Sequence, residues 1–196
     1  MQFTILIDSA EQHPFTFQGI RADANSSYEP IIPSIQSTCL GRHPNSLGDY
    51  SLLGGVGRCH IERKSMEDAH STILGFNDGH RERFESELRN LATIEAGLVI
   101  VECTFDQLLQ NSPSYGKKTA AQNAKILFRS VLAYQQDCKV PWLFCDGRGL
   151  AEHSAYWFLH RFWEKNLKEK SSRSASKGSK VSTFSLDEAK QLLEGV

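Results

Sequence analysis

The stretch at residues 98–101 restricts the fold of this chain more than any other, because every position in it is apolar. Its sequence is Leu-Val-Ile-Val, and β-branched side chains such as valine and isoleucine favour strands. A strand with one face in water alternates apolar and polar residues, whereas a continuous apolar run is typical of a strand covered on both faces. Glu102 follows directly, at the strand end where functional side chains often collect. The run therefore predicts a sheet with helices on both sides.

Further β-rich runs predict that the N-terminal third of the chain is mostly sheet. The candidate strands are residues 3–7, 35–40, 52–53 and 59–63. Gly54, Gly55 and Gly57 lie between the last two runs, and glycines supply the positive-φ freedom that a tight connection needs. We expect a hairpin there rather than a phosphate-binding loop.

After residue 60 the pattern alternates between strand and helix. Ser65 is typical of an N-cap for a helix beginning near Met66, and a second helix is expected over residues 81–96, with Gly97 as its stop. Apolar residues at helical spacing predict helices at residues 120–137 and 152–168, with a short strand at 142–145 between them. This order predicts an α/β fold in which a mixed β-sheet is flanked by α-helices.

The domain organisation follows from length and composition. With 196 residues, of which 40% are hydrophobic, the chain is long enough for one sizeable core. We expect one domain over residues 1–169. From residue 170 to 182 the composition changes to Ser, Lys, Arg and Gly, so residues 170–196 are expected to form a flexible basic linker and a short C-terminal helix.

Composition also excludes several classes of protein. The first apolar run is broken by Asp8 and lacks a basic leader, and no later segment approaches the roughly 20 apolar residues of a membrane span, so a cytoplasmic location without membrane contact is expected. The five cysteines are widely spaced and form no CxxC pair, which argues against a disulfide framework or a zinc knuckle. Because the net charge is −1, any nucleic-acid binding must come from local patches.

Asp49, Glu62 and Lys64 form the most informative constellation. Residues two apart on a strand share a face, so Glu62 and Lys64 should lie together while Arg63 points away, and the hairpin should bring Asp49 alongside. Two carboxylates in one concavity favour Mg²⁺ or Mn²⁺, and a neighbouring lysine suits phosphodiester hydrolysis. For an isolated Glu-x-Lys the commoner interpretation is an exposed ion pair, with Asp49 capping a turn.

The surrounding residues favour the catalytic interpretation. Gly48-Asp49-Tyr50, a hairpin, Glu62-Arg63-Lys64 and then Asp68 reproduce a GDY…ERK…D pattern, and residues 7–11, 81–91 and 98–102 extend the match. In these motifs the chain resembles the XPF-type nuclease domains, a branch of the PD-(D/E)XK superfamily with a restriction-endonuclease-like fold. The resemblance covers most of the chain.

The resemblance implies an endonuclease that hydrolyses DNA with Mg²⁺, for which Mn²⁺ can substitute, and that acts in DNA repair or recombination. Asp49 and Glu62 would ligate the metal and Lys64 would assist the attacking water, with Asp8 and Glu11 as auxiliary acidic groups.

The residues around the proposed metal site have more varied expected roles. Arg63 is expected to form an ion pair or to contact a DNA phosphate, and Arg81 and Arg83 would extend that phosphate contact. Asp68 fits either a catalytic support or the acid of a Ser65 capping box. The chain has Ala10 where many members carry arginine, and it has no room for a tandem helix-hairpin-helix module or a fused helicase, so a stand-alone prokaryotic or phage-type nuclease is expected.

Several alternatives stay open. The fold could serve as a catalytically silent DNA-binding or assembly module, or as a restriction-type or RNA-directed nuclease. The aromatic residues at 156–163 favour a core or a dimer surface over base stacking, so a homodimer or another protein partner is a further expectation. Gly116-Lys117-Lys118-Thr119 lacks the upstream glycine of a phosphate loop, which argues against ATP binding.

Overall fold

A computed structural model describes residues 2–18, 20, 33–40, 47–76 and 79–168, and within them the chain forms a six-stranded mixed sheet. The strand order is β2-β1-β3-β4-β5-β6. The strands are β1 (Thr4–Asp8), β2 (Ser34–Thr38), β3 (Tyr50–Leu52), β4 (Cys59–Lys64), β5 (Ala96–Val101) and β6 (Trp142–Phe144). β3 runs antiparallel to both β1 and β4, whereas β2 is parallel to β1, and β4, β5 and β6 are parallel to one another. The predicted hairpin between β3 and β4 is confirmed.

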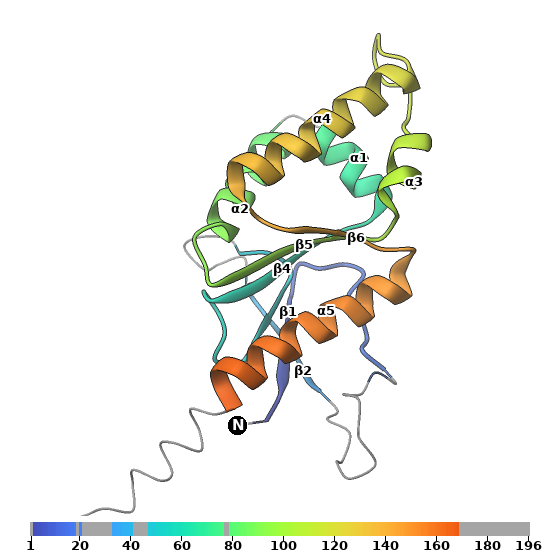
Figure 1. Cartoon of the computed structure of the whole chain (residues 1–196). Helices are drawn as coiled ribbons and strands as arrows, with labels where there is room; N and C mark the ends of the chain where they lie inside the picture. Colours follow the sequence, from blue (N-terminus) through green and yellow to red (C-terminus); the bar gives the residue numbers. More distant parts are fainter. Residues whose placement is uncertain (1, 19, 21–32, 41–46, 77–78, 169–196) are drawn as a thin grey trace, which may run out of the picture.

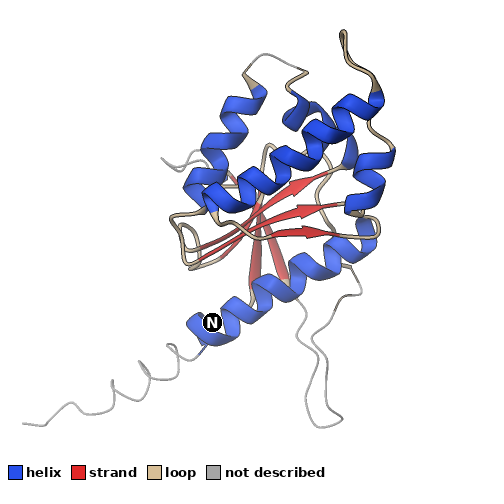
Figure 2. Cartoon of the chain, turned by 45° about the horizontal axis from the view of Figure 1, so that its top comes forward, coloured by secondary structure: helices blue, strands red, loops and turns tan. Residues whose placement is uncertain are grey.

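Helices cover both faces of the sheet, as predicted (Figures 1 and 2). One layer contains α1 (Met66–Leu74), α2 (His80–Leu91), α3 (Phe105–Gln110) and α4 (Ala120–Cys138). The opposite face is covered by α5 (Arg148–Trp163), which a π-helical turn, η2 (Glu164–Lys168), continues. The α/β class and the restriction-endonuclease-like arrangement of a flanked mixed sheet are confirmed.

Strand β5 shows why the sheet needs two helical layers. Leu98 and Ile100 belong to the buried cluster on the α5 side, whereas Val99 and Val101 belong to the cluster formed with α1 to α4. All four side chains are at most 6% exposed. Burial of both faces therefore stabilises the strand that the apolar run predicted.

Two helix boundaries differ from the predictions. The helix expected over residues 81–96 ends at Leu91, and Gly97 lies inside β5 rather than stopping a helix. A Cβ atom at Gly97 would lie 2.7 Å from the backbone oxygen of Leu91, so this glycine permits a close approach of α2 and β5. The last helix begins at Arg148, four residues before the predicted start at 152, and the six-residue helix α3 was not predicted.

The predicted linker and C-terminal helix at residues 170–196 lie outside the described residues. Within the described ranges, no helix combines the length and the apolar character needed to cross a bilayer.

Candidate active site

Asp49 is fixed beside β4 by its own backbone. Its N–H donates to the Ile61 carbonyl at 2.8 Å, and its carbonyl accepts from the Asp8 N–H at 2.8 Å. This approach requires Gly48, which has a φ of +65° and whose Cβ, if present, would lie 2.6 Å from the Ile61 oxygen. The Asp49 Oδ2 atom accepts from the Arg63 N–H at 2.8 Å. The glycine of the GDY motif therefore allows the aspartate to approach β4.

Glu62 and Lys64 lie together on the other face of β4 from Arg63, as the strand periodicity predicted. The Lys64 Nζ atom donates to Glu62 Oε1 at 2.7 Å and lies 3.1 Å from Asp68 Oδ2. Glu62 and Lys64 are both buried, and the ammonium lies 4.9 Å from the centre of the Phe84 ring. This pair is therefore a buried contact at the sheet end, and the exposed surface pair considered from the sequence is wrong.

Of the two roles considered for Asp68, the structure shows its carboxylate turned to the pocket and no capping-box contact from it to Ser65. Ser65 caps α1, since its Oγ accepts from the Asp68 N–H at 3.1 Å. The Asp68 carboxylate turns to Lys64 and also accepts from Thr72 Oγ1 at 3.2 Å. The residue thus both occupies the first turn of α1 and faces the charged pocket.

Together, the burial and the charges of this cluster raise the pKa values of both Asp49 and Lys64. Burial, followed by the charge of Glu62, raises the pKa of Asp49 well above its usual value. Burial lowers the pKa of Lys64, but the charges of Glu62 and Asp68 outweigh it and raise that pKa above its ordinary value. Lys64 is therefore a permanent cation, whereas the two carboxylates repel each other and favour a bound cation between them.

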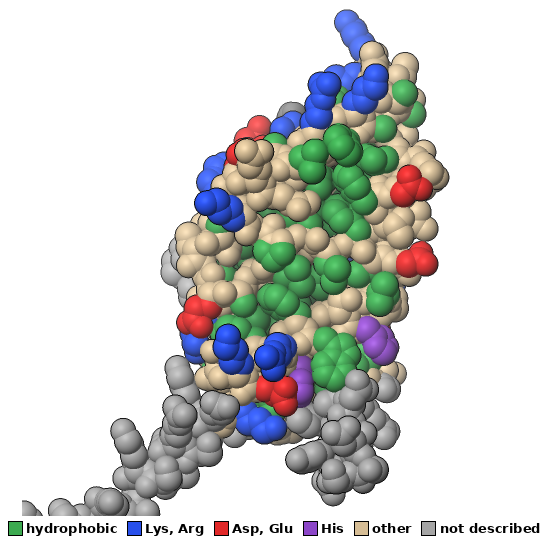
Figure 3. All heavy atoms as spheres, viewed as in Figure 1, with side chains coloured by type: hydrophobic (Ala, Val, Ile, Leu, Met, Phe, Trp, Pro, Cys, Tyr) green, Lys and Arg blue, Asp and Glu red, His purple; other side chains and the backbone are tan. Residues whose placement is uncertain are grey.

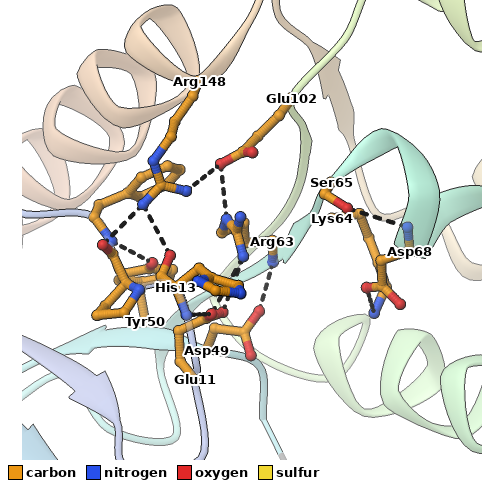
Figure 4. A network of polar contacts seen from close by, with 12 residues as sticks. Glu11, His13, Asp49, Tyr50, Arg63, Lys64, Ser65, Asp68, Glu102 and Arg148 are labelled. Carbon is orange, nitrogen blue, oxygen red and sulfur yellow. Dashed lines mark hydrogen bonds and ion pairs between the residues drawn. The ribbon is translucent and has the colours of Figure 1, made fainter.

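Arg63 forms a buried network on the opposite face of β4 (Figure 4). Its Nε donates to Glu102 at 2.8 Å and its NH1 donates to Glu11 at 3.2 Å. Arg148, from the first turn of α5, donates to the same Glu102 oxygen at 2.9 Å and to the backbone carbonyls of His13 and Pro14. The network ties the ends of β4 and β5, the start of α5 and the segment after β1 together.

The tyrosine of the GDY motif holds that same N-terminal segment. Tyr50 is fully buried, and its hydroxyl accepts from the Phe15 N–H at 2.9 Å. The Phe15 ring stacks on Tyr50 at 5.1 Å between centroids, and both Arg63 and Arg148 lie over Phe15. The segment that carries Asp8 and Glu11 is therefore packed against the site.

A pocket of about 570 Å³ collects most of the predicted residues. Its lining includes Asp8, Glu11, Asp49, Glu62, Arg63, Lys64, Asp68 and Arg83. Arg83 also pairs with Glu87 at 3.7 Å, whereas Arg81 lies outside this lining and donates to Glu85 at 3.1 Å. The structure thus brings together every predicted metal and catalytic residue, and one of the two flanking arginines.

The carboxylates of this pocket suit Mg²⁺, which keeps several waters, better than a metal that is held by protein ligands alone. Among the residues that the structure describes, no group of three or more His, Cys, Asp or Glu side chains is arranged to hold an ion. Mg²⁺ keeps several waters and is typically held by one or two carboxylates together with substrate phosphates. Asp49 and Glu62 match that requirement, because they are two repelling carboxylates in an open polar pocket.

Three residues of the site were not predicted. Arg148 lies outside the helix expected from the sequence, and its link to Glu102 joins positions 46 apart in sequence. His80 and Glu87 line the pocket from α2, whose orientation depends on packing against α4 and β5. Glu102 was noticed only as a strand-end acid, and nothing local indicated that two arginines share it.

Comparisons with known proteins bear on the fold of the chain. No family model and no curated protein matches the chain. Among solved structures, XPF from Aeropyrum pernix has a TM-score of 0.50 at 15% sequence identity, covering 87% of this chain and 69% of that one. XPF from Aeropyrum pernix in complex with DNA has a TM-score of 0.52 at 16% identity, covering 84% of this chain and 66% of that one. This chain has an XPF-type nuclease fold.

The two matches cover 87% and 84% of this chain, so the likeness is not limited to the GDY and ERK motifs. The match spans about two thirds of the length of each Aeropyrum pernix chain, at 69% and 66%. At this identity the likeness concerns the fold, and the resemblance predicted from the motifs is confirmed at that level.

Proposed function

We propose that this protein is a Mg²⁺-dependent DNA endonuclease that hydrolyses phosphodiester bonds with a metal-activated water. The observation that carries the proposal is the convergence of Asp49 with the Glu62–Lys64 pair in one polar pocket. An XPF-type nuclease fold with this pocket suits phosphate chemistry, and one of the similar structures contains DNA. A role in DNA repair or recombination is part of the same proposal.

In this proposal each pocket residue has a distinct task. Asp49 and Glu62 would hold Mg²⁺, with Asp8 near them, and Mn²⁺ should substitute because it accepts the same oxygen ligands. The bound ion would polarise the scissile phosphate and lower the pKa of a coordinated water. Lys64, held against Glu62 at 2.7 Å, would orient that water and offset the charge that grows on the phosphate.

Arg63 and Glu11 serve this site indirectly. Glu11 is committed to Arg63, and Arg63 to Glu11 and Glu102, so we assign both to positioning the ends of the strands. The role of Glu11 as a metal ligand remains a prediction.

The test is cleavage of labelled single-stranded, duplex, flap and fork DNA with Mg²⁺, Mn²⁺ or EDTA. Asp49→Ala and Lys64→Ala should abolish metal-dependent cutting, whereas Asp106→Asn, an exposed acid on α3, should leave it unchanged. If the wild type binds DNA but cuts none of these substrates, the silent-module alternative replaces the nuclease. If it cuts RNA of the same sequence at least as fast, the polymer assignment is wrong.

We also propose that a second copy of the chain binds at an apolar strip beside β6 (Figure 3). The strip consists of Phe128 and Leu132 on α4, Leu143 on β6, and Leu150 and Trp157 on α5, each 37–53% exposed. Continuous apolar surface of this kind is typical of interaction sites.

A second copy suits the strip because the five residues carry no charge, so two identical strips can face each other across a twofold axis without repulsion. β6 is also the outermost described strand on this side, and an edge strand can extend a sheet into a partner.

A further inference from the structure

A basic region occupies the turn before α4 and the first half of that helix. Residues 107–136 contain Lys117, Lys118, Lys125 and Arg129 but no aspartate or glutamate, although the whole chain has a net charge of −1. All four side chains are exposed. In Figure 3 lysine and arginine side chains gather at this upper end of the molecule, above the apolar strip. We call these four residues the basic surface.

The cations of the basic surface are available to a ligand. Within the described part of the chain, none of the four forms an ion pair. Arg63, Arg81 and Arg83, which the sequence suggested as phosphate contacts, are each paired with a glutamate. Binding phosphate there would require breaking an existing pair, whereas the basic surface requires no such exchange.

The turn that carries Lys117 and Lys118 is held by hydrogen bonds and by a ring contact to Phe76. The backbones of Tyr115 and Lys118 exchange two hydrogen bonds, of 3.2 and 3.1 Å, around Gly116. The Tyr115 hydroxyl donates to the Phe76 carbonyl at 2.9 Å, and the two rings lie 4.1 Å apart. The two lysines are therefore presented from a turn that is attached to the end of α1.

Helix α1 connects this turn to the catalytic pocket. Asp68 and Thr72 line the pocket, and Phe76 lies two residues beyond the last residue of α1. At a rise of about 1.5 Å per residue, Leu74, the last residue of α1, is roughly 9 Å along the helix axis from Asp68. That distance corresponds to about three base pairs of B-DNA, at ~3.4 Å per step.

We propose that the basic surface is a second DNA contact, which binds backbone phosphates about three or more nucleotides from the scissile bond. The inference rests on the proposed nuclease function for its substrate. Its chemistry is sequence-independent: exposed lysines and an arginine neutralise phosphates and release counterions. The basic surface thus supplies the local patch that a chain of net charge −1 needs in order to bind a polyanion.

The experiment compares two triple variants that each remove two lysines and one arginine. The first is Lys117→Gln, Lys118→Gln and Arg129→Gln; the control is Lys139→Gln, Arg161→Gln and Lys165→Gln, which are also cations without an ion pair among the described residues. Affinity for a labelled 30-base-pair duplex is measured in EDTA by fluorescence anisotropy from 50 to 200 mM salt. Circular dichroism verifies that both variants are folded.

We expect the first variant to bind about tenfold or more weakly at 50 mM salt and the slope of log K against log salt to fall by roughly 2–3, since each phosphate contact contributes ~0.9. The control should change affinity by less than about twofold. In cleavage with Mg²⁺, the first variant should raise KM and leave kcat unchanged, because the contact is made equally in ground and transition states.

The inference is overturned if both triple variants have the wild-type slope, or if both lose affinity equally. Its failure is distinguishable from failure of the nuclease proposal. If the wild type cuts DNA and the first variant keeps the wild-type salt slope, only the basic surface is refuted. If the wild type never cuts DNA but the first variant has a reduced salt slope, only the nuclease proposal is refuted.

Discussion

Arg63→Ala should destabilise the protein far more than Arg58→Ala, although both remove an arginine paired with a glutamate. The side chains of Arg63, Glu11 and Glu102 are only 9%, 8% and 11% exposed, so Arg63→Ala leaves a buried carboxylate without its cation. Removing one partner of a buried pair costs about 3–5 kcal/mol. Glu102 keeps Arg148, so the loss falls on Glu11, and we expect about 3 kcal/mol.

Arg58 and Glu95 supply the matched comparison. Their side chains are 30% and 53% exposed, and the shortest distance between them is 2.6 Å. Exposed pairs contribute about 0–1 kcal/mol, so Arg58→Ala should fall in that range. The free energy of unfolding is measured by urea titration at low salt, with the m-value checked for each variant.

If Arg63→Ala costs no more than Arg58→Ala, the buried network is not a stabilising element. A double variant, Arg63→Ala with Glu11→Gln, should recover about 1–2 kcal/mol relative to Arg63→Ala, because no carboxylate is then left unpaired at Glu11. No recovery would show that the loss comes from packing of the Arg63 stem.

Three other predictions concern metal, pH and assembly. Mg²⁺ should raise the melting temperature of the wild type but not of Asp49→Asn, because only the wild type has both carboxylates for the ion; an equal shift in both places the metal elsewhere. Burial, followed by the charge of Glu62, raises the pKa of Glu87 from 4.5 to about 7, so its stabilising proton is fully present below pH 4.5 and lost as the pH rises through 7. In Glu87→Gln the free energy of unfolding should therefore change less with pH between those values. At pH 8 the variant should be more stable than the wild type by up to about 3 kcal/mol. The same pH dependence in variant and wild type would contradict this. Light scattering should give a dimer for the wild type and a monomer for Leu143→Asp. The control Leu53→Asp changes a similarly exposed leucine on the β3–β4 turn and should stay dimeric. A wild type that is monomeric at high concentration would refute the interface.

Local pattern was sufficient for the strands and for the core of the site. The two-residue periodicity of β4 separates Lys64 from Arg63, and the structure places them on opposite faces. The Ser65 N-cap and the doubly covered strand β5 are likewise properties of a few neighbouring residues. These features could be predicted because strand periodicity and the residue types within a few positions determine them.

The remaining features depend on contacts between distant segments. Gly97 permits α2 to approach β5, which no local pattern distinguishes from a helix stop. Arg148 reaches Glu102 only because parallel strands place the end of β5 beside the start of α5. Helix α3 was missed because six residues give little periodicity, although its capping box, Thr104 with Gln107, was readable in the sequence.

The proposed activity is cleavage of DNA at the pocket that contains Asp49, with a divalent metal ion. The most direct measurement is the single-turnover cleavage rate of labelled fork and duplex DNA against Mg²⁺ concentration, with wild type and Asp49→Asn purified in parallel. We expect a wild-type rate that saturates with Mg²⁺ and disappears in EDTA, and a rate at least 100-fold lower for folded Asp49→Asn, in line with the loss of an electrostatic catalytic group. Equal rates in the two preparations, or cutting that persists in EDTA, would contradict the account.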